Sequence, residues 1–359
     1  MSLFENLQQL WPMPSRPRPI TMIGAGGIVR DAHLPAYKKW NLPVAGIFDV
    51  DTGRAQALAD KFLITRVHET FEQAMNGGTA DVLDIAVPPQ VLREVLEQVP
   101  PGSVALIQKP LGVNLAEARQ MSALLKQRDV TAAVNFQLQF TPAMLAVSDA
   151  IARGLFGEIT EVEVHLACAT PWDDWPFMRT LEAVEIPLHS IHYLDWIRAS
   201  FGQPEKVYAK SLPHPAFPEL ADARSSIILD YGDSIRCCLS LNHTHRWGTK
   251  NEQATIRVEG TKGAALVGVG YQLNFPDGAP ETLQMIVKGG EWQDIELKGA
   301  RIPDSFAGVM ANLQRFASGE DDRLLTSIPD SVASMALVDA CLKSNATGQA
   351  VKVEQQAHQ

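Results

Sequence analysis

The stretch RPITMIGAGGIVRDAHLPAYKKW, residues 18–40, holds a short apolar run, then a cluster of glycines, then residues compatible with a helix. A short apolar run bounded by such a cluster predicts a buried strand. We expect the strand to turn into the helix at the glycines, because glycine adopts the backbone conformations that tight turns require. The stretch therefore predicts the first strand and helix of a βαβ unit.

The same alternation of strand and helix continues as far as residue 137. Further apolar runs end in acidic residues, prolines or polar residues, and most are followed by a segment with apolar residues at helical spacing. The expected strands lie within 43–51, 80–89, 103–110 and 131–137, and the expected helices within 52–62, 91–99 and 114–130. This alternation predicts a doubly wound parallel sheet with helices on both faces, whose ligands bind beyond the carboxyl ends of the strands.

Length and charge limit the classes of protein to consider. A chain of 359 residues is too long for one small core and predicts two domains. With 31 basic and 41 acidic residues, the net charge is −10, which argues against nucleic acid or an anionic membrane as a partner. The sequence contains no run of about 18 uncharged apolar residues, the length of a membrane span, and its first residues lack the pattern of a signal peptide.

The cysteines and histidines do not predict a metal site. The four cysteines lack metal-type spacing, so we expect free thiols in a reducing cytoplasm. His243 and His245 fall on one face of an expected strand, but no third ligand of the right kind is nearby in the sequence, so we expect no metal.

The glycine cluster, and the acid that ends the second expected strand, are candidates for binding a dinucleotide. Gly24 would permit the tight turn, Gly26 would let a pyrophosphate approach the backbone, and the helix N-terminus would offer unpaired N–H groups. Val29 stands where the fingerprint has its third glycine, so the match is partial. Asp49 is placed to accept hydrogen bonds from the adenosine ribose and would repel a 2′-phosphate, which favours NAD over NADP, and Arg54 lies several residues late for a phosphate clamp. Alternatively, Asp49 only caps the turn that follows it.

Several motifs together resemble the Gfo/Idh/MocA dehydrogenases, a family that includes glucose–fructose oxidoreductase and inositol dehydrogenase. The resemblance covers most of the chain and rests on the order and spacing of GAGGIVRDAHLPAY (24–37), DVLDIAVPP (81–89), QKPLGVNLAEA (108–118), HSIHYLD (189–195), PDSFAGVM (303–310) and SVASMALVDACLKSNATGQAV (331–351). It implies an NAD-binding Rossmann domain over residues 1–140, with 1–17 as an extended lead-in. It also implies a substrate-binding and oligomerisation domain over residues 141–359, an α/β domain with a large, mostly antiparallel open sheet and a C-terminal helix that packs back towards the first domain. Since family members pair through that sheet, the resemblance implies a homodimer or homotetramer.

The second half of the chain fits such a sheet on its own terms. Strands are expected within 159–170, 205–212, 224–232, 234–243, 254–269, 271–276, 282–289 and 292–297. Their alternation is one-sided, which predicts one buried face and one face open to solvent or a partner. Alternatively, helices cover the second face.

Lys109 follows the apolar run that begins at residue 104, where an ammonium group has no packing use. In the family, the corresponding strand ends in Glu-Lys-Pro, and its lysine contacts the nicotinamide ribose and the reacting oxygen of the substrate; here Gln108 replaces the glutamate. Gln108 supplies no negative charge, so we expect Lys109 to lose its proton more readily than it would beside a glutamate. The alternative is a surface lysine at a strand exit. The motif and the resemblance together assign to the cofactor Gly24, Gly26, Gly27, Ile28, Val29, Asp49, Val87, Pro88, Gln108 and Lys109.

The segment EIPLHSIHYLD, residues 185–195, contains the second group of candidate catalytic residues. On the expected helix His189 and His192 are three residues apart and face the same side. The family pattern Asp-x-x-x-His, aligned on His192, puts Leu188 at the aspartate position, so we expect His189 or Glu185 to take over that polar role. His192 would exchange the proton with the lysine and His189 would orient the substrate. The alternative is that both are core histidines bonded to the backbone.

A few polar and aromatic residues are candidates for binding the substrate. Trp172 and Asp173 follow an expected strand, and a ring that stacks on C–H groups beside an acid that accepts hydroxyl hydrogen bonds suits a polyol. A solvated loop anchored by the tryptophan is the alternative. Asn135 and Gln137, at the end of an expected strand, would lie near the nicotinamide, and Glu185 completes this substrate-binding set.

These residues predict an NAD-dependent oxidoreductase that transfers a hydride between nicotinamide and a sugar, inositol or related polyol, or its keto form. Oxidising an alcohol requires a hydride acceptor, a proton acceptor and stabilisation of charge on oxygen, and Lys109 and His192 would handle the proton. One alternative is an NAD-dependent glycoside hydrolase, which shows no net consumption of cofactor. The other is a non-catalytic NAD(H)-binding sensor, which the departures at Leu188 and Gln108 would suit.

Overall fold

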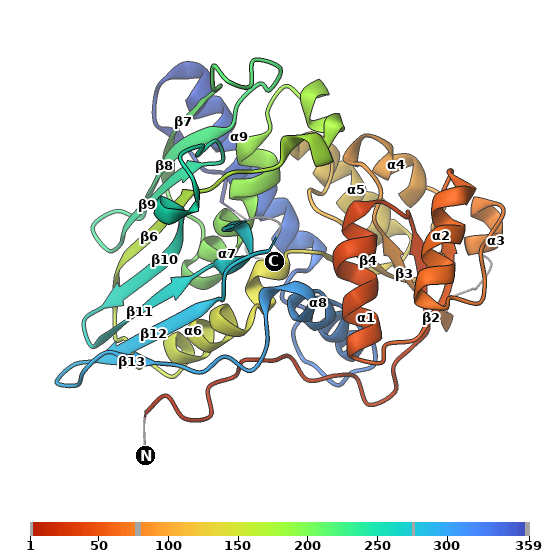
Figure 1. The fold of residues 1–359 in the computed structure, drawn as a ribbon, viewed down its shortest axis with the longest axis horizontal. Helices are drawn as coiled ribbons and strands as arrows, with labels where there is room; N and C mark the ends of the chain where they lie inside the picture. Colours follow the sequence, from red (N-terminus) through yellow and green to blue (C-terminus); the bar gives the residue numbers. More distant parts are fainter. Residues whose placement is uncertain (1–2, 76–79, 275–276, 356–359) are drawn as a thin grey trace. The chain divides into compact units, whose positions relative to one another are not determined.

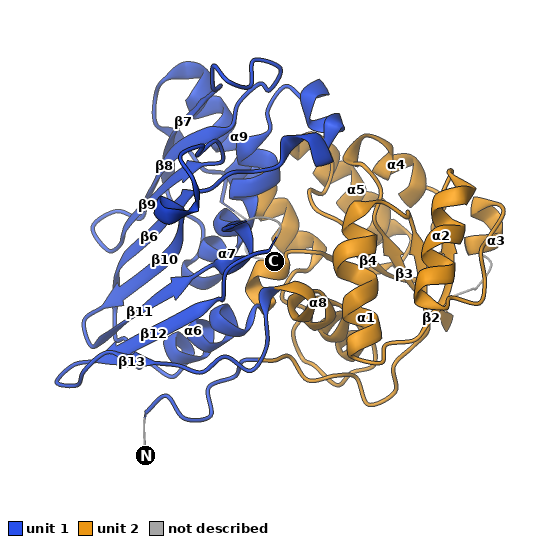
Figure 2. Ribbon diagram, in the orientation of Figure 1, with its two compact units in different colours: residues 1–9, 141–301, 336–359 blue, residues 10–140, 302–335 orange. Residues whose placement is uncertain are grey.

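The computed structural model describes residues 3–75, 80–274 and 277–355. The chain divides into two compact units (Figure 2), each described here by itself. We call residues 10–140 and 302–335 the parallel-sheet unit, and residues 1–9, 141–301 and 336–359 the open-sheet unit.

The parallel-sheet unit is built on five parallel strands in the order β2-β1-β3-β4-β5. Figure 1 labels three of them, β2, β3 and β4. Its strands are β1 (Ile20–Ile23), β2 (Val44–Phe48), β3 (Val82–Ile85), β4 (Val104–Ile107) and β5 (Thr131–Val134). Its helices are α1 (Leu34–Lys39), α2 (Thr52–Phe62), α3 (Phe71–Met75), α4 (Pro89–Leu96), α5 (Leu115–Gln127) and nearly all of α8 (Arg301–Ala317). The strand order reverses between β1 and β3, and this switch point is where sheets of this kind bind their ligands. The predicted doubly wound sheet is confirmed.

Local sequence explains why these elements form where they do. All four residues of β1, β3 and β4 are buried, as expected for strands covered on both faces. Helix α5 begins where the Asn114 side chain accepts a hydrogen bond of 2.9 Å from the Glu117 N–H. Its buried residues recur every three or four positions, which is the spacing of one helical face.

The open-sheet unit contains a nine-stranded sheet in the order β13-β12-β11-β10-β6-β9-β8-β7-β14, in which β6 and β9 are parallel and the other pairs antiparallel. Its strands are β6 (Ile159–Ala167), β7 (Lys206–Leu212), β8 (Arg224–Asp230), β9 (Arg236–Asn242), β10 (Gln253–Gly260), β11 (Gly263–Gly268), β12 (Thr282–Val287), β13 (Gln293–Asp294) and β14 (Val351–Lys352). Its helices are α6 (Pro142–Ala152), α7 (Ile191–Phe201) and the later part of α9 (Ile328–Thr347). The predicted large, mostly antiparallel sheet is confirmed.

One predicted strand is wrong. The segment 271–276 was expected to be extended, but Gly270–Gln272 forms a turn of 3-10 helix, and residues 275 and 276 lie outside the described part of the chain. The chain doubles back here so closely that a Cβ on Gly270 would lie 1.9 Å from the Ala279 carbonyl oxygen. Alternating apolar residues alone did not reveal this close return of the backbone.

The sheet of the open-sheet unit buries one face and exposes the other. Strand β7 buries Val207 and Ala209, whereas the side chain between them, Tyr208, is 42% exposed. Tyr208 is paired across strands with Ile228, which is 55% exposed. We call the exposed side, with Tyr208 and Ile228, the open face.

Candidate active site

The glycine turn after β1 is packed tightly against the end of β3. Gly24 has a φ of +109°, a conformation that side chains disfavour, and a Cβ at this position would lie 2.4 Å from the Ala86 carbonyl oxygen. By contrast, a Cβ on Gly26 would meet no atom within 4 Å, so the backbone is open there. The carbonyl oxygen of Gly26 accepts hydrogen bonds of 3.1 Å from the N–H groups of Val29 and Arg30, which begin the helical turn. The turn leaves room for a phosphate beside its backbone.

Asp49 is fixed beside this turn at the carboxyl end of β2. Its Oδ2 accepts a hydrogen bond of 2.6 Å from the Ala25 N–H, and its Oδ1 accepts one of 2.8 Å from the Asp51 N–H. The carboxylate therefore both caps the following turn and lies against the glycine turn, where it has further lone pairs for the two hydroxyls of a ribose. Asp51 caps helix α2, and Arg54 pairs with it at 3.0 Å, so Arg54 already has an anionic partner. The glycine turn and Asp49 fit a dinucleotide without a 2′-phosphate.

The remaining expected cofactor residues lie in the same unit. Gly27 and Ile28 lead into a π-helical turn, Val29–His33, which continues into α1. Val87 and Pro88 lie in the short connection between β3 and α4, and Pro88 is the N-terminal cap residue of α4.

Lys109 leaves β4 at its carboxyl end and is half-buried. The preceding residue stays in the ladder, since the Gln108 N–H donates to the Ile85 carbonyl oxygen at 2.9 Å. The Gln108 side chain folds back, and its Oε1 accepts a hydrogen bond of 2.9 Å from the Lys109 N–H. The Lys109–Pro110 peptide bond is cis. Gln108 thus holds the backbone of the lysine at the ligand-binding edge of the sheet.

Behind Gln108 lies a buried polar network that the sequence analysis missed. His33, Asp84 and Asn135 are fully buried. Asp84 Oδ2 lies 2.7 Å from His33 Nδ1 and accepts a hydrogen bond of 2.6 Å from the Tyr37 hydroxyl. On the other side of the ring, His33 Nε2 lies 3.3 Å from Asn135 Nδ2 and 3.5 Å from Gln108 Nε2. A charged residue inside the apolar run VLDI was the signal that could have revealed it.

Asn135 and Gln137 have different surroundings, although both were expected near the nicotinamide. Asn135 directly follows β5, and its N–H donates to the Ile107 carbonyl oxygen at 2.8 Å. Gln137 begins a 3-10 helix, Gln137–Phe140, and is 7% exposed.

In the open-sheet unit, Glu185 is a fully buried acid just before the π-helical turn Ile186–Ser190 that leads into α7. The Ser190 hydroxyl lies 2.8 and 2.9 Å from its two carboxyl oxygens, and burial raises the pKa of Glu185 to about 8. His243 Nε2 is 3.7 Å from Glu185 Oε1, and burial lowers the pKa of His243 to about 3. Although the distance would allow an ion pair, burial favours the neutral form of both groups. The contact between His243 and Glu185 has no local signal in the sequence, because the two residues are far apart along the chain.

Three aromatic rings form a cluster beside Glu185. His189 and His243 have ring centroids 4.3 Å apart, and Trp172 packs edge-on against both, at 5.6 and 6.1 Å. The structure thus brings Trp172, His189 and Glu185 into one cluster. His192 is buried, at 7% exposure, one turn further along α7. Asp173 does not join the cluster, because its side chain is 93% exposed and pairs with Arg179.

A doubly wound parallel sheet with an open glycine turn and a fixed carboxylate at its switch point is typical of nucleotide-binding domains. Comparison with protein-family models agrees: residues 19–136 match "Oxidoreductase family, NAD-binding Rossmann fold", and residues 144–266 match "GFO/IDH/MocA C-terminal domain". The chain belongs to the GFO/IDH/MocA oxidoreductase family, and the resemblance seen in the sequence is confirmed. It is an NAD-binding oxidoreductase.

Individual relatives are distant. The chain is 24% identical to D-apiose dehydrogenase of Paraburkholderia graminis over 345 residues, covering 93% of this chain and 89% of that protein. It is 27% identical to trans-1,2-dihydrobenzene-1,2-diol dehydrogenase of Mus musculus, covering 68% of this chain and 73% of that protein. Its fold matches the crystal structure of an oxidoreductase from Agrobacterium radiobacter in complex with NAD+, L-tartaric acid and magnesium, with a TM-score of 0.78, 22% identity and coverage of 94% and 98% of the two chains.

Proposed function

We propose that this protein is an NAD-dependent dehydrogenase or reductase that acts on a sugar, inositol or related polyol, or its keto form. The observation that carries the proposal is that the glycine turn, Asp49 and the backbone of Lys109 all lie at the carboxyl ends of one parallel sheet. The names of D-apiose dehydrogenase and of the dihydrodiol dehydrogenase support a substrate that carries hydroxyl groups. Because these relatives are named as dehydrogenases, we favour neither a glycoside hydrolase nor a non-catalytic sensor.

In this proposal NAD, when bound, would supply the hydride transfer, and the side chains of the protein handle binding and the proton. The glycine turn would hold the pyrophosphate, and Asp49 would accept hydrogen bonds from the ribose. Lys109 takes the proton from the substrate hydroxyl, or returns it in the reverse direction. Its backbone is held by Gln108, whose amide adds no negative charge that would favour the ammonium form.

We propose that the open-sheet unit supplies the substrate-binding groups. His192 exchanges the proton with Lys109, and His189 orients the substrate. Trp172 and Glu185 support His189 within the cluster of rings described above. Glu185, protonated because of its burial, offers a hydrogen-bond donor rather than a charge.

The first test is a titration of the cofactor-free protein with NADH and with NADPH, followed by nicotinamide fluorescence. We expect tight binding of NADH and weak binding of NADPH. A panel of sugars and polyols with NAD, followed by NADH absorbance, then identifies the substrate. Failure to bind either cofactor would overturn the proposal, and tighter binding of NADPH would overturn the role given to Asp49.

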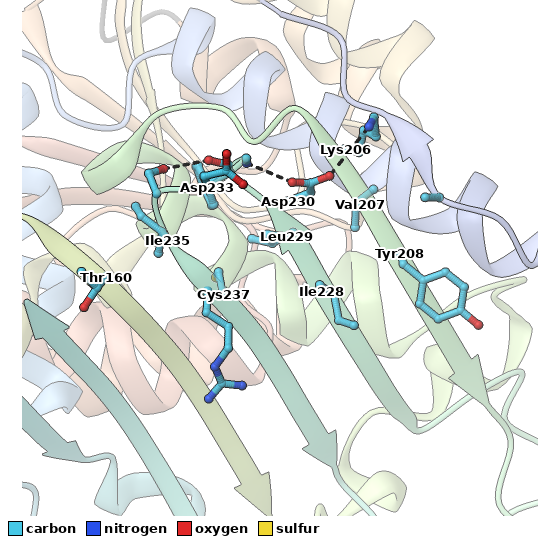
Figure 3. Close-up of a pocket in the computed structure, with 15 residues that line it drawn as sticks. Thr160, Lys206, Val207, Tyr208, Ile228, Leu229, Asp230, Asp233, Ile235 and Cys237 are labelled. Atoms are coloured by element: carbon cyan, nitrogen blue, oxygen red, sulfur yellow. Dashed lines mark hydrogen bonds and ion pairs between the residues drawn. The ribbon is translucent and has the colours of Figure 1, made fainter.

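We propose that the protein forms a homodimer or homotetramer through the open face. Tyr208 and Ile228 border a hollow of about 640 Å³ above β7, β8 and β9, flanked by Lys206 and Asp230 (Figure 3). Exposed apolar side chains in a concave, charge-bordered surface suit a second copy of the chain. Sedimentation velocity should show that Ile228→Lys is monomeric, whereas Val91→Lys, at a similarly exposed apolar residue of α4, keeps the assembly. An unchanged assembly in Ile228→Lys would contradict this interface.

The free thiols bear on localisation. No helix in the described part of the chain is long and apolar enough to cross a membrane. The four cysteines are all free thiols, three of them buried. Because free thiols persist in reducing surroundings, we propose that the protein works in a reducing compartment such as the cytoplasm.

A further inference from the structure

We propose that Gln108 holds His33 as the imidazole tautomer protonated on Nδ1, and that this ring positions Gln108 and, through it, Lys109. The inference rests on the proposed role of Lys109 in proton transfer. His33 is then a positioning residue, since its ring acts through Gln108 and not on the substrate.

The network spans the carboxyl ends of three adjacent strands. Asp84 lies in β3, Gln108 follows β4 and Asn135 follows β5, while His33 ends the π-helical turn that leads from the glycine turn into α1. The end of the π-helical turn and the Lys109 N–H are therefore connected by one chain of polar groups. Its central ring is fully buried, so solvent does not provide alternative partners.

The orientation of the Gln108 amide decides the tautomer of His33. Its Oε1 is committed to the Lys109 N–H at 2.9 Å, so its nitrogen is the atom that faces His33 Nε2 at 3.5 Å. Asn135 Nδ2 faces the same ring nitrogen at 3.3 Å. A proton on Nε2 would point at the amide N–H group of Gln108, whose orientation is fixed by the bond from the Lys109 N–H, so Nε2 is the acceptor and Nδ1 carries the hydrogen.

The charged group nearest to His33 favours the protonated ring, the imidazolium. The anion that faces the ring is Asp84, 2.7 Å from Nδ1, and a carboxylate at this distance favours an imidazolium. Tyr37 and Phe306 also face the ring, but neither adds a charge; burial and the adjacent Asp84 raise the pKa of Tyr37 well above its usual range. The amide of Gln108 therefore opposes the effect of Asp84. A carboxylate at position 108 would accept from Nε2 and recruit a second proton onto His33.

The direct test is ¹⁵N NMR of histidine-labelled protein without cofactor, with the His33 signals assigned through His33→Gln. We expect Nδ1 protonated and Nε2 unprotonated in the wild-type protein. In Gln108→Glu, both nitrogens of His33 should become protonated. Gln98→Glu adds the same charge at an exposed residue of this unit and should leave His33 unchanged. An imidazolium in the wild-type protein, or an unchanged neutral ring in Gln108→Glu, would overturn the proposal.

Catalysis supplies a second readout that a purely structural role would not move. In Gln108→Glu, the pH profile of kcat should move to higher pH by about one unit, because the carboxylate favours the ammonium form of Lys109. His33→Gln keeps a donor for Asp84 and an acceptor for Gln108, so it should retain most of the kcat that His33→Ala loses, with NADH affinity similar in both. Equal kcat in these two variants would count against positioning by the ring.

The two proposals fail in different ways. If the protein bound no NADH and oxidised no polyol, the proposed function would fail, yet the NMR spectrum would still report the tautomer of His33. If the enzyme were active but His33 were an imidazolium, only the positioning role would fail.

Discussion

Glu185 gives the sharpest stability prediction, because a fully buried carboxyl group changes charge within an accessible pH range. Burial raises its pKa in the folded protein from 4.5 to about 8. Between these two values the unfolded chain has released the proton and the folded protein has kept it. The folded state then binds more protons than the unfolded state, so the free energy of unfolding falls as pH rises through this window. Replacing Glu185 by Gln removes this loss.

The size of the effect follows from the width of the window. Each pH unit between the two pKa values is worth about 1.4 kcal/mol. From pH 5 to pH 8 the stability of Glu185→Gln relative to the wild-type protein should therefore rise by about 4 kcal/mol. His243, with its pKa lowered to about 3, has the opposite effect between pH 3 and pH 6.5, because there the unfolded chain binds the extra proton. Comparing variant with wild type at each pH cancels that contribution.

The measurement is urea unfolding followed by far-UV circular dichroism at pH 5, 6, 7 and 8. Stopping at pH 8 keeps most cysteine thiols of the unfolded chain protonated, because their pKa is about 8.5. Glu291→Gln, at an exposed carboxylate of the same unit, is the control and should show no trend with pH relative to wild type. Parallel stability curves for wild type and Glu185→Gln from pH 5 to 8 would refute the reasoning.

Three further substitutions test the parallel-sheet unit. Gly24→Ala should weaken NADH binding at least tenfold and destabilise the protein by about 1–3 kcal/mol in thermal unfolding, because its Cβ would lie 2.4 Å from the Ala86 carbonyl oxygen at a positive φ; native-like binding and stability would contradict the tight turn. Asp49→Ala should lower NADH affinity by about tenfold or more while leaving NADPH binding no weaker, measured by nicotinamide fluorescence, since it removes two hydrogen bonds and a negative charge; an equal loss for both cofactors would argue against discrimination by Asp49. Lys109→Ala should reduce kcat/KM by about 10²- to 10⁴-fold in steady-state assays on the identified substrate, and normal turnover would exclude the lysine as the proton acceptor.

The parallel-sheet unit was the more predictable part of the fold, because its signals are local. The run ITMI before Gly24 and the acid that ends the next strand are read directly from neighbouring residues, and both lie where the sequence placed them. The contacts of Asp84 with His33 could not be read this way, since they join residues 51 apart through the packing of a helix on a sheet. The cluster of Glu185 with His243 has the same character, because it joins the start of a helix to the end of a strand 58 positions later.

The open face carries a chemical handle of its own. Cys238 is paired across strands with Ile228 on one side and Glu163 on the other, and it is the one cysteine of the four that is not buried. Burial raises the pKa of its thiol, so a maleimide would react with it slowly, and more quickly as pH rises. Its labelling rate would therefore report whether that face is covered, even at dilutions where sedimentation loses sensitivity.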